Sequence, residues 1–302
     1  MFTNTVAVIT GASSGIGAAL AEVLAAEGVT VVLAARRKDK LDQVTQRITQ
    51  AGGKALAVRC DVTVSQDAEE LIHHTIQQYG RIDILVNNAG RGNFASIEDT
   101  TDDMIEHIFA VNGFALWYTT RPALRYMRQQ KTGHIINIAS MAGKFGFPFN
   151  SAYVAAKHAC IGFTHALRLE LAGTGINATV VCPSGVLTEW AVKTEGGPML
   201  PLFAEAGLIA KEIARERGIP LPDIEGVLAP NAIAEKILEC LHHPVAEVYT
   251  HRGAREFALL AAQNREEAER RYLPIALAER QVYERLKGQT TAPARPTPDA
   301  NA

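Results

Sequence analysis

The sequence predicts an α/β fold in which a doubly wound parallel sheet is covered by helices on both faces. From the start to about residue 190, short β-branched apolar segments alternate with longer helical patterns, as in repeated βαβ units. The apolar segments are continuous, so both faces of the sheet are expected to be buried. About seven strands are expected, at residues 6–10, 29–34, 55–59, 82–87, 134–139, 177–182 and 246–250.

The segments between these strands carry the spacing of apolar residues that is typical of helices. Residues 191–228 depart from this rhythm, with Gly196, Gly197 and several prolines around a helical pattern at 202–217. An insertion of this kind is typical of a mobile substrate flap. The other expected helices span residues 17–27, 40–51, 66–79, 101–129 and 152–172.

A helical extension is expected after the last strand, over residues 254–288, with a kink at Pro274. Residues 289–302 are rich in Thr, Pro and Ala and are expected to be disordered. The apolar side chains of the extension need a cover. A second subunit of a homodimer or homotetramer is one candidate, and the pocket of the same chain is the other. Five glutamates disfavour a membrane-surface helix: Glu266, Glu267, Glu269, Glu279 and Glu284.

Composition excludes several classes of protein. The 302 residues are 47% hydrophobic, enough for a sizeable core, and 30 basic against 32 acidic side chains give no field that would attract nucleic acid. Neither a basic leader nor 18 consecutive apolar residues occurs, so no membrane span and a cytoplasmic location are expected. The cysteines lie far apart and are expected to be buried free thiols, without a metal site: Cys60, Cys160, Cys182 and Cys240.

A glycine-rich loop follows the first strand and opens directly into a helix. Glycines allow a tight turn and a close approach of the backbone to a phosphate, and a pyrophosphate is expected at the helix N-terminus. The spacing is G-x-x-x-G-x-G, not the commoner G-x-G-x-x-G, and a plain turn is the alternative. The loop residues expected to bind the cofactor are Gly11, Ser13, Ser14, Gly15, Ile16 and Gly17.

The second strand ends at Ala35, Arg36 and Arg37, where NAD-binding folds place a carboxylate for the ribose 2′-hydroxyl. No carboxylate is present here. The two arginines offer permanently charged donors for a 2′-phosphate, with the Ser14 hydroxyl nearby, which predicts NADP(H) in preference to NAD(H). The alternative is that the arginines only solvate a loop.

Taken in order, the motifs over residues 4–250 resemble the short-chain dehydrogenase/reductase family. That resemblance implies a seven-stranded Rossmann sheet and hydride transfer at a nicotinamide, with residues 1–253 as the dinucleotide-binding and catalytic domain. Besides the glycine loop, the resemblance rests on Asp61 with Val62, the run Asn87, Asn88, Ala89 and Gly90, Asn112, Ser140, Tyr153-x-x-x-Lys157, and Pro183 with Thr188.

Four residues form the expected catalytic set. Tyr153 and Lys157 are four apart on one helix, hence on one face, where the ammonium and an oxidised nicotinamide can together lower the pKa of the phenol from about 10. The resemblance implies that Tyr153 is the general acid or base, that Ser140 binds the same substrate oxygen, and that Lys157 holds the nicotinamide ribose. It also implies that a helix distortion at Asn112 lets its backbone carbonyl hold a water that relays protons to Lys157.

The resemblance also assigns cofactor contacts outside the glycine loop. Asp61 and Val62 are expected along the adenine, although Asp61 also suits a plain turn. The chain departs from the family at Ser184, where a glycine usually follows the late proline. The remaining expected contacts are Asn88, Ala89, Gly90, Tyr153, Lys157, Pro183, Val186 and Thr188.

These features predict an NADP(H)-dependent oxidoreductase that interconverts a ketone or aldehyde and an alcohol on a hydrophobic substrate. A 3-oxoacyl-[acyl-carrier-protein] reductase is the alternative, with Lys144, Arg91 and Lys193 as a basic entrance. A non-catalytic dinucleotide-sensing or scaffold protein is disfavoured by the intact catalytic set. Core packing competes with pocket lining for Phe145, Phe147, Pro148, Phe149, Trp190, Met199, Leu200, Leu202 and Phe203.

Overall fold

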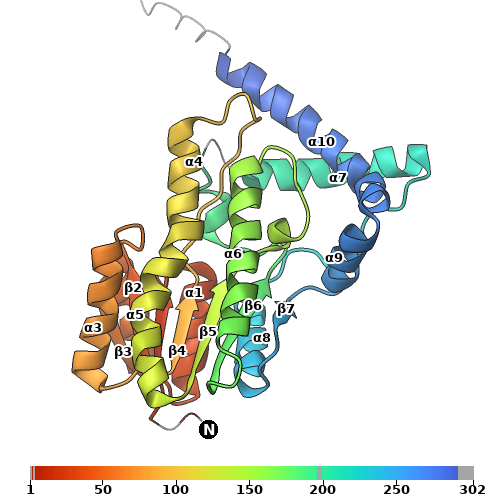
Figure 1. Ribbon diagram of the computed structural model, residues 1–302. Coiled ribbons are helices and arrows are strands. Elements are labelled where there is room, and N and C mark those ends of the chain that lie inside the picture. The colour runs from red at the N-terminus through yellow and green to blue at the C-terminus, as the bar shows by residue number, and fades with distance from the viewer. Residues whose placement is uncertain (1, 3, 196–198, 292–302) are drawn as a thin grey trace, which may run out of the picture.

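A wholly parallel sheet forms the centre of the molecule (Figure 1). The computed structural model describes residues 2, 4–195 and 199–291, and within them the sheet has seven strands in the order β3-β2-β1-β4-β5-β6-β7. The order reverses between β1 and β4, the point at which such sheets bind ligands. The predicted fold class is confirmed. The strands are β1 Val6–Thr10, β2 Thr30–Ala35, β3 Lys54–Arg59, β4 Ile84–Asn87, β5 Gly133–Ile138, β6 Ile176–Cys182 and β7 Glu247–Tyr249.

Helices cover both faces of the sheet because inner strands such as β1 and β2 bury apolar side chains on both sides. Helices α1, α2 and α8 share one apolar core with the strands, and α3, α5 and α6 share another. Helix α8 was not anticipated. The helices are α1 Gly15–Ala26, α2 Lys38–Gln50, α3 Ser65–Tyr79, α4 Asp102–Phe109, α5 Ala115–Gln130, α6 Ser151–Glu170, α7 Met199–Arg217, α8 Pro230–His242, α9 Ala254–Gln263 and α10 Arg265–Thr291.

The continuous helix expected over residues 101–129 is interrupted. Helix α4 ends at Phe109, a π-helical turn spans Ala110–Phe114, and α5 begins at Ala115. Asn112 and Gly113, both buried, lie in this wider turn. Asn and Gly are poor residues for a helix interior, and π turns of this kind gather at functional sites.

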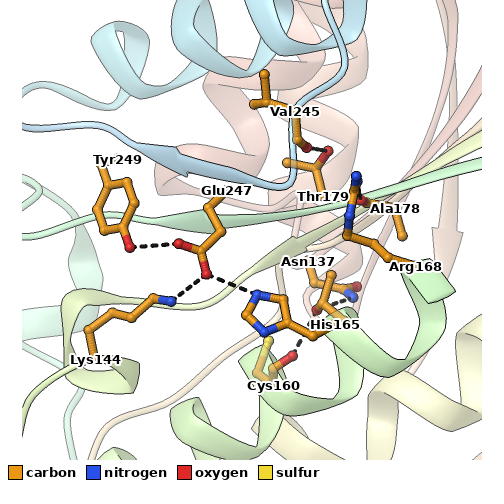
Figure 2. A network of polar contacts seen from close by, with 11 residues as sticks. Asn137, Lys144, Cys160, His165, Arg168, Ala178, Thr179, Val245, Glu247 and Tyr249 are labelled. Atoms are coloured by element: carbon orange, nitrogen blue, oxygen red, sulfur yellow. Dashed lines mark hydrogen bonds and ion pairs between the residues drawn. The ribbon is translucent and has the colours of Figure 1, made fainter. Parts of the chain in front are cut away.

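Buried polar side chains fix α6 against the sheet (Figure 2). Asn137 on β5 donates to the Thr164 hydroxyl at 2.9 Å, and Thr164 donates to the Cys160 carbonyl at 2.7 Å. The Thr179 hydroxyl on β6 donates to the Val245 carbonyl at 2.6 Å, next to β7. Because satisfied buried polar groups require one packing arrangement, these bonds fix the helix that carries the site.

The C-terminal extension breaks at a different place from the one expected. The backbone turns at Asn264, while α10 runs on through Pro274. Asn264 caps the new helix, because its side-chain oxygen accepts from the Glu267 backbone N–H at 3.0 Å. Helical backbone continues to Thr291, and the rest of the tail predicted to be disordered lies outside the described residues.

Helix α10 packs on α7 of the same chain (Figure 1). Met199, Ala206 and Ala210 of α7 form a buried cluster with Ala278 and Val282 of α10. Thus this chain itself covers α10, and the large apolar side chains of the extension that are exposed in the described part of the chain are Leu259 and Leu273. The glycines of the expected flap, Gly196 and Gly197, lie outside the described residues. The division of the chain at residue 253 stays a prediction.

Two further sequence expectations bear on the class of protein. All four cysteines are free and buried, as predicted. Across residues 4–195 and 199–291, no group of histidine, cysteine and acidic side chains is arranged to hold a metal ion. No helix in the described part of the chain combines the length and the apolar character needed to cross a bilayer.

Candidate active site

The four expected catalytic residues meet beside the carboxyl end of β5. Ser140 follows that strand, Tyr153 and Lys157 lie on the first turns of α6, and Asn112 lies in the π turn. The Ser140 hydroxyl lies near enough to Tyr153 to lower the pKa of the phenol. The Lys157 Nζ atom lies 5.5 Å from the centre of the Tyr153 ring and donates to the Ile138 carbonyl at 2.9 Å. The spacing of four thus places both side chains on one face, as predicted.

Burial acts on the ionisation of both Tyr153 and Lys157. Burial raises the pKa of Tyr153 well above its usual value, and the nearby Ser140 hydroxyl offsets only part of this effect. Burial likewise lowers the pKa of Lys157. The Lys157 ammonium faces a backbone carbonyl, so in the chain alone it does not bring the phenol toward neutrality. Tyr153 therefore holds its proton firmly.

Asn112, Gly90 and Lys157 converge on one side of the tyrosine. The Asn112 amide nitrogen donates to the Arg91 carbonyl at 2.8 Å and to the Ile108 carbonyl at 3.0 Å. Its side-chain oxygen is buried without a partner among the described residues. A Cβ at Gly90 would lie 2.9 Å from that oxygen and 3.5 Å from Lys157 Nζ, so only glycine leaves this space open. The predicted helix distortion at Asn112 is present as the π turn.

Sequence reasoning missed Asn93, which holds the first turn of α6. The residue is fully buried, and its side-chain oxygen accepts from the Tyr153 backbone N–H at 2.9 Å. An N–H in the first turn of a helix has no partner within the helix, so a side-chain acceptor fixes that turn. The available signal was an asparagine three residues after Gly90, between Gly92 and Phe94.

We expect Asn93→Ala to lower kcat for the reaction of this site about 10-fold with a smaller change in KM, because small displacements of a reacting group are costly. Asn93→Asp keeps an acceptor for the Tyr153 N–H and should restore most of kcat. Asn150→Ala is the matched control, since that side chain also lies at the start of α6 but bonds to the Pro148 carbonyl. Equal losses in Asn93→Ala and Asn93→Asp would contradict a positioning role.

The glycine-rich loop is packed against the residues that follow β4. Gly11 and Gly15 have φ values of 64° and 58°, which favour glycine. A Cβ at Gly17 would lie 2.5 Å from the Asn88 amide nitrogen, which donates to the Thr10 carbonyl at 2.9 Å. The Asn88 side chain thus holds the loop by a hydrogen bond to its backbone. Ile16 packs against the core shared by α1 and α8. The turn leaves the backbone at the start of α1 free to approach a phosphate.

Arg37 contacts this loop, although its side chain is 37% exposed. Its guanidinium donates to the Ser13 and Ser14 hydroxyls, each at 2.9 Å, and to the Glu189 carboxylate at 2.8 Å. Lys193 also contacts Glu189, and these two cations lower the pKa of Glu189 to about 2. The alternative of a solvated loop arginine therefore does not hold for Arg37.

Arg36 lies beside Asp61, with 3.8 Å between guanidinium nitrogen and carboxylate oxygen. Burial raises the pKa of Asp61, but hydrogen bonds from Thr63 and the charge of Arg36 outweigh it and lower the net value. Asp61 accepts from the Thr63 backbone N–H at 3.0 Å and hydroxyl at 2.7 Å, so the expected plain turn is present too. Val62 next to it is buried.

The segment after β6 contacts both the serine and the glycine loop. The Pro183 carbonyl accepts from the Ser140 hydroxyl at 3.4 Å, and a Cβ at Gly15 would lie 3.0 Å from the Thr188 methyl carbon. Val186 bridges to Leu228. This brings the expected nicotinamide segment next to the expected phosphate loop.

Sequence reasoning also missed His251. Its ring is hydrogen-bonded to the backbone of this segment at Ser184, where the chain departs from the family, and at Gly185. The Ser184 backbone N–H donates to Nδ1 of His251 at 3.2 Å, and Nε2 donates to the Gly185 carbonyl at 2.8 Å. Burial lowers the pKa of His251, so the ring is neutral when it makes both bonds. Hydrogen bonds to His251 thus fix the backbone where glycine is replaced.

Aromatic side chains surround the tyrosine on its open side. The Trp190 ring centre lies 5.2 Å from that of Tyr153, and Phe147 packs in the same cluster. Phe145 is buried, and Phe149 stacks on Tyr283 of α10 at 4.1 Å. Phe203 is exposed, Met199 is buried beneath α10, Pro148 supplies a carbonyl to Asn150, and the side chains of Leu200 and Leu202 lie outside the described residues.

The three basic residues expected at the entrance are engaged within the chain. Lys144 turns toward Glu247, which also contacts His165 at 2.9 Å and the Tyr249 hydroxyl at 2.6 Å (Figure 2). Lys193 pairs with Glu189, and Arg91 donates to the Lys193 carbonyl at 3.2 Å. The carboxylates reduce the positive field that an acidic carrier protein would meet.

Comparison with known proteins decides the family. The sequence profile of the short chain dehydrogenase family matches residues 5–197. The chain belongs to this family. Ketoacyl reductase HetN of Nostoc sp. is 33% identical over 254 residues, which cover 83% of this chain and 80% of that protein.

Solved structures of short-chain dehydrogenases share the fold. A short chain dehydrogenase/reductase from Burkholderia phymatum in complex with NAD matches with a TM-score of 0.75 and 27% identity over 88% of this chain and 95% of that one. Actinorhodin polyketide ketoreductase with NADPH matches with a TM-score of 0.71 and 31% identity over 82% and 97%. The protein is therefore an oxidoreductase acting on CH–OH or carbonyl groups with a nicotinamide dinucleotide. The open space at Gly90 and the loop at Gly11 fit that cofactor.

Proposed function

We propose that this short-chain dehydrogenase is an NADP(H)-preferring carbonyl reductase, which interconverts a ketone or aldehyde and an alcohol on a hydrophobic substrate. The observation that carries the proposal is the position of the Ser140 hydroxyl, near enough to Tyr153 to lower the pKa of the phenol, with Lys157 one helical turn further along α6. A phenol and a hydroxyl so placed can both bind one carbonyl oxygen. Trp190 and Phe147 around them favour an apolar substrate.

In reduction, Tyr153 donates its proton to the carbonyl oxygen, and Ser140 hydrogen-bonds the same oxygen as negative charge develops there. The reduced nicotinamide, when bound, supplies the hydride to the carbonyl carbon. Lys157 holds the ribose and, with the Asn112 backbone carbonyl and a water, returns a proton to Tyr153. The protonated phenol is the form that acts as an acid in reduction, and burial raises the pKa of Tyr153.

NADP(H) preference rests on the charges near the glycine loop. Arg36, Arg37 and Lys193 face only two carboxylates, Asp61 and Glu189, so one positive charge is left over. A planar guanidinium that already bridges two hydroxyls is well placed to bind a phosphate through two donors. The NAD complex of one relative shows that the fold alone does not set this choice.

We expect kcat/KM to favour NADPH over NADH about 10- to 100-fold, since a charged donor on a 2′-phosphate contributes roughly 1.5 to 3 kcal/mol. Replacing both Arg36 and Arg37 by Ala should bring the ratio toward one, mainly through KM for NADPH. Arg47→Ala is the control, because that arginine pairs with Glu22 on the outer surface of α1 and α2. An unchanged ratio in the double variant would refute the assignment.

The substrate class is tested by NADPH oxidation against ketones, β-ketoacyl thioesters and quinones. A β-ketoacyl reductase is the second candidate, because relatives are described as a ketoacyl reductase and a polyketide ketoreductase. Reduction of free β-ketoacyl thioesters at rates equal to those of ketones would support that candidate. If NADPH were oxidised with none of these carbonyl compounds, the non-catalytic dinucleotide-sensing or scaffold protein would remain as the alternative.

We also propose a homodimer or homotetramer. Phe114 and Trp117 near the start of α5 are 51% and 43% exposed, and Ile105 on α4 is also exposed. Exposed apolar side chains that lie close enough to form one patch are typical of protein contacts. The partner in this proposal is a second copy of the chain, apart from the small-molecule substrate.

A further inference from the structure

The C-terminal extension places a buried glutamate and a partly buried tyrosine beside the site. Tyr272 and Glu279 lie two turns apart on α10, and the Tyr272 hydroxyl donates to Oε1 of Glu279 at 3.3 Å. Glu279 is only 5% exposed, and its Oε2 atom is buried without a hydrogen-bond partner among the described residues. Buried polar atoms without partners are rare in folded proteins and call for a physical reason.

This pair lies one layer of side chains from the catalytic tyrosine. The Tyr272 ring centre is 5.3 Å from that of Phe147, and Phe147 packs in the cluster that holds Tyr153. Around the same helix, Ala278 packs in the cluster with Trp190, whose ring contacts Tyr153. In Figure 1, α10 crosses α7 beyond the sheet. The extension thus forms a wall of the region around Tyr153.

The protonation of Glu279 decides what it can bind. Burial raises its pKa to about 8, and Tyr272 is the one group in the described chain that acts on it, so at neutral pH the side chain is an uncharged acid. Because Oε1 accepts from Tyr272, the proton lies on Oε2. The unused atom is therefore a donor that needs an oxygen acceptor. Burial also raises the pKa of Tyr272, so that hydroxyl stays a donor.

We propose that Glu279, oriented by Tyr272, is a specificity-determining residue that donates a hydrogen bond to an uncharged substrate oxygen distant from the reacting carbonyl. The group recognised is a second carbonyl, an ether or a hydroxyl on an otherwise apolar ketone. This inference rests on the proposed carbonyl reductase function and narrows its substrate class. A substrate carrying an ammonium group would instead require the ionised carboxylate.

The test compares 2-tetralone with its 5-, 6- and 7-methoxy derivatives, which add one ether oxygen at different positions. Dissociation constants are measured by calorimetry on the enzyme with NADP+, and kcat/KM separately with NADPH. At least one methoxy ketone should bind about 10-fold more tightly than 2-tetralone, consistent with one hydrogen bond to a buried group. Glu279→Leu should abolish that preference.

Glu279→Gln tests whether residue 279 acts as a hydrogen-bond donor or as a charged carboxylate. Its amide can still donate to an ether oxygen, so the preference should stay within about threefold of the wild type. Tyr272→Phe should reduce the preference, because the acid loses its fixed orientation. Glu284→Gln, at an exposed position of the same helix, is the control and should behave as the wild type.

The binding and turnover measurements test the role of Glu279 and the carbonyl reductase function separately. A methoxy preference in binding that Glu279→Leu removes supports the inference even where no tetralone is reduced, an outcome that would count against the proposed function. Reduction of all four ketones with no methoxy preference would overturn the inference and leave the function standing. A preference that persists in Glu279→Leu, or vanishes equally in Glu279→Gln, would also overturn it.

Discussion

Tyr153→Phe is expected to lower kcat for ketone reduction by at least about 10²-fold, while the dissociation constant for NADPH changes less than about twofold. The substitution removes only the transferable proton, and the ring still packs against Trp190. General acid catalysis contributes typically 10²- to 10⁴-fold, which sets the lower bound. Stopped-flow oxidation of NADPH and fluorescence titration of the cofactor measure the two quantities.

Two other variants test the division of roles. Lys157→Ala should weaken both cofactor binding and turnover, because the ammonium is expected to serve both. Ser140→Ala should lower kcat without changing the dissociation constant for NADPH, since its hydroxyl acts on Tyr153 and donates to the Pro183 carbonyl. A Tyr153→Phe enzyme that kept more than about a tenth of the rate would show that another group supplies the proton.

The sheet could be predicted because its cause is local. Runs such as Val6–Thr10 are buried on both faces, and continuous apolar segments bounded by glycine or polar turns specify parallel strands. The glycine loop and the pair Tyr153 and Lys157 could be predicted for a similar reason, since each depends on spacing within a few residues. All seven expected strands occur, with ends shifted by a few residues.

Contacts between distant parts of the chain could not be predicted. Arg37 is hydrogen-bonded to Glu189, 152 positions away in the sequence, and His251 to Ser184, 67 positions away. The Asn93 side chain accepts a hydrogen bond from the Tyr153 backbone N–H, 60 positions away. Sequence patterns report which side chains need burial or a partner but do not identify the partner, because that depends on how the crossovers place the loops.

The C-terminal extension shows the same limit. Its apolar spacing indicated that a cover was needed, and both a second subunit and this chain fitted that requirement. The packing of Ala278 and Val282 on α7 shows that this chain supplies the cover for α10. Glu279 was counted among five glutamates that disfavour a membrane-surface helix, yet it is the one that is buried. A single buried acid on an otherwise charged helix leaves no periodic signal.

Burial of Glu279 is expected to make the protein less stable as the pH rises from 5 to 9. The carboxyl has a pKa of 4.5 in the unfolded chain and about 8 in the folded one, so between these values folding retains a proton that the unfolded chain releases. Stability then falls by about 1.4 kcal/mol per pH unit, of the order of 4 kcal/mol in all. Glu279→Gln has no proton to lose and removes this dependence.

Urea unfolding at pH 5, 7 and 9 measures the effect as the difference between Glu279→Gln and the wild type. That difference should be small at pH 5, grow in favour of the variant through pH 7, and level off above pH 8. Buried His134, whose pKa burial lowers to about 4, opposes this trend below pH 6.5, but it does so equally in both proteins and cancels. Glu284→Gln should leave the pH dependence as it is. Parallel curves for Glu279→Gln and the wild type would show that Glu279 ionises in the folded protein as it does in the unfolded chain, and that its inward position carries no energetic cost.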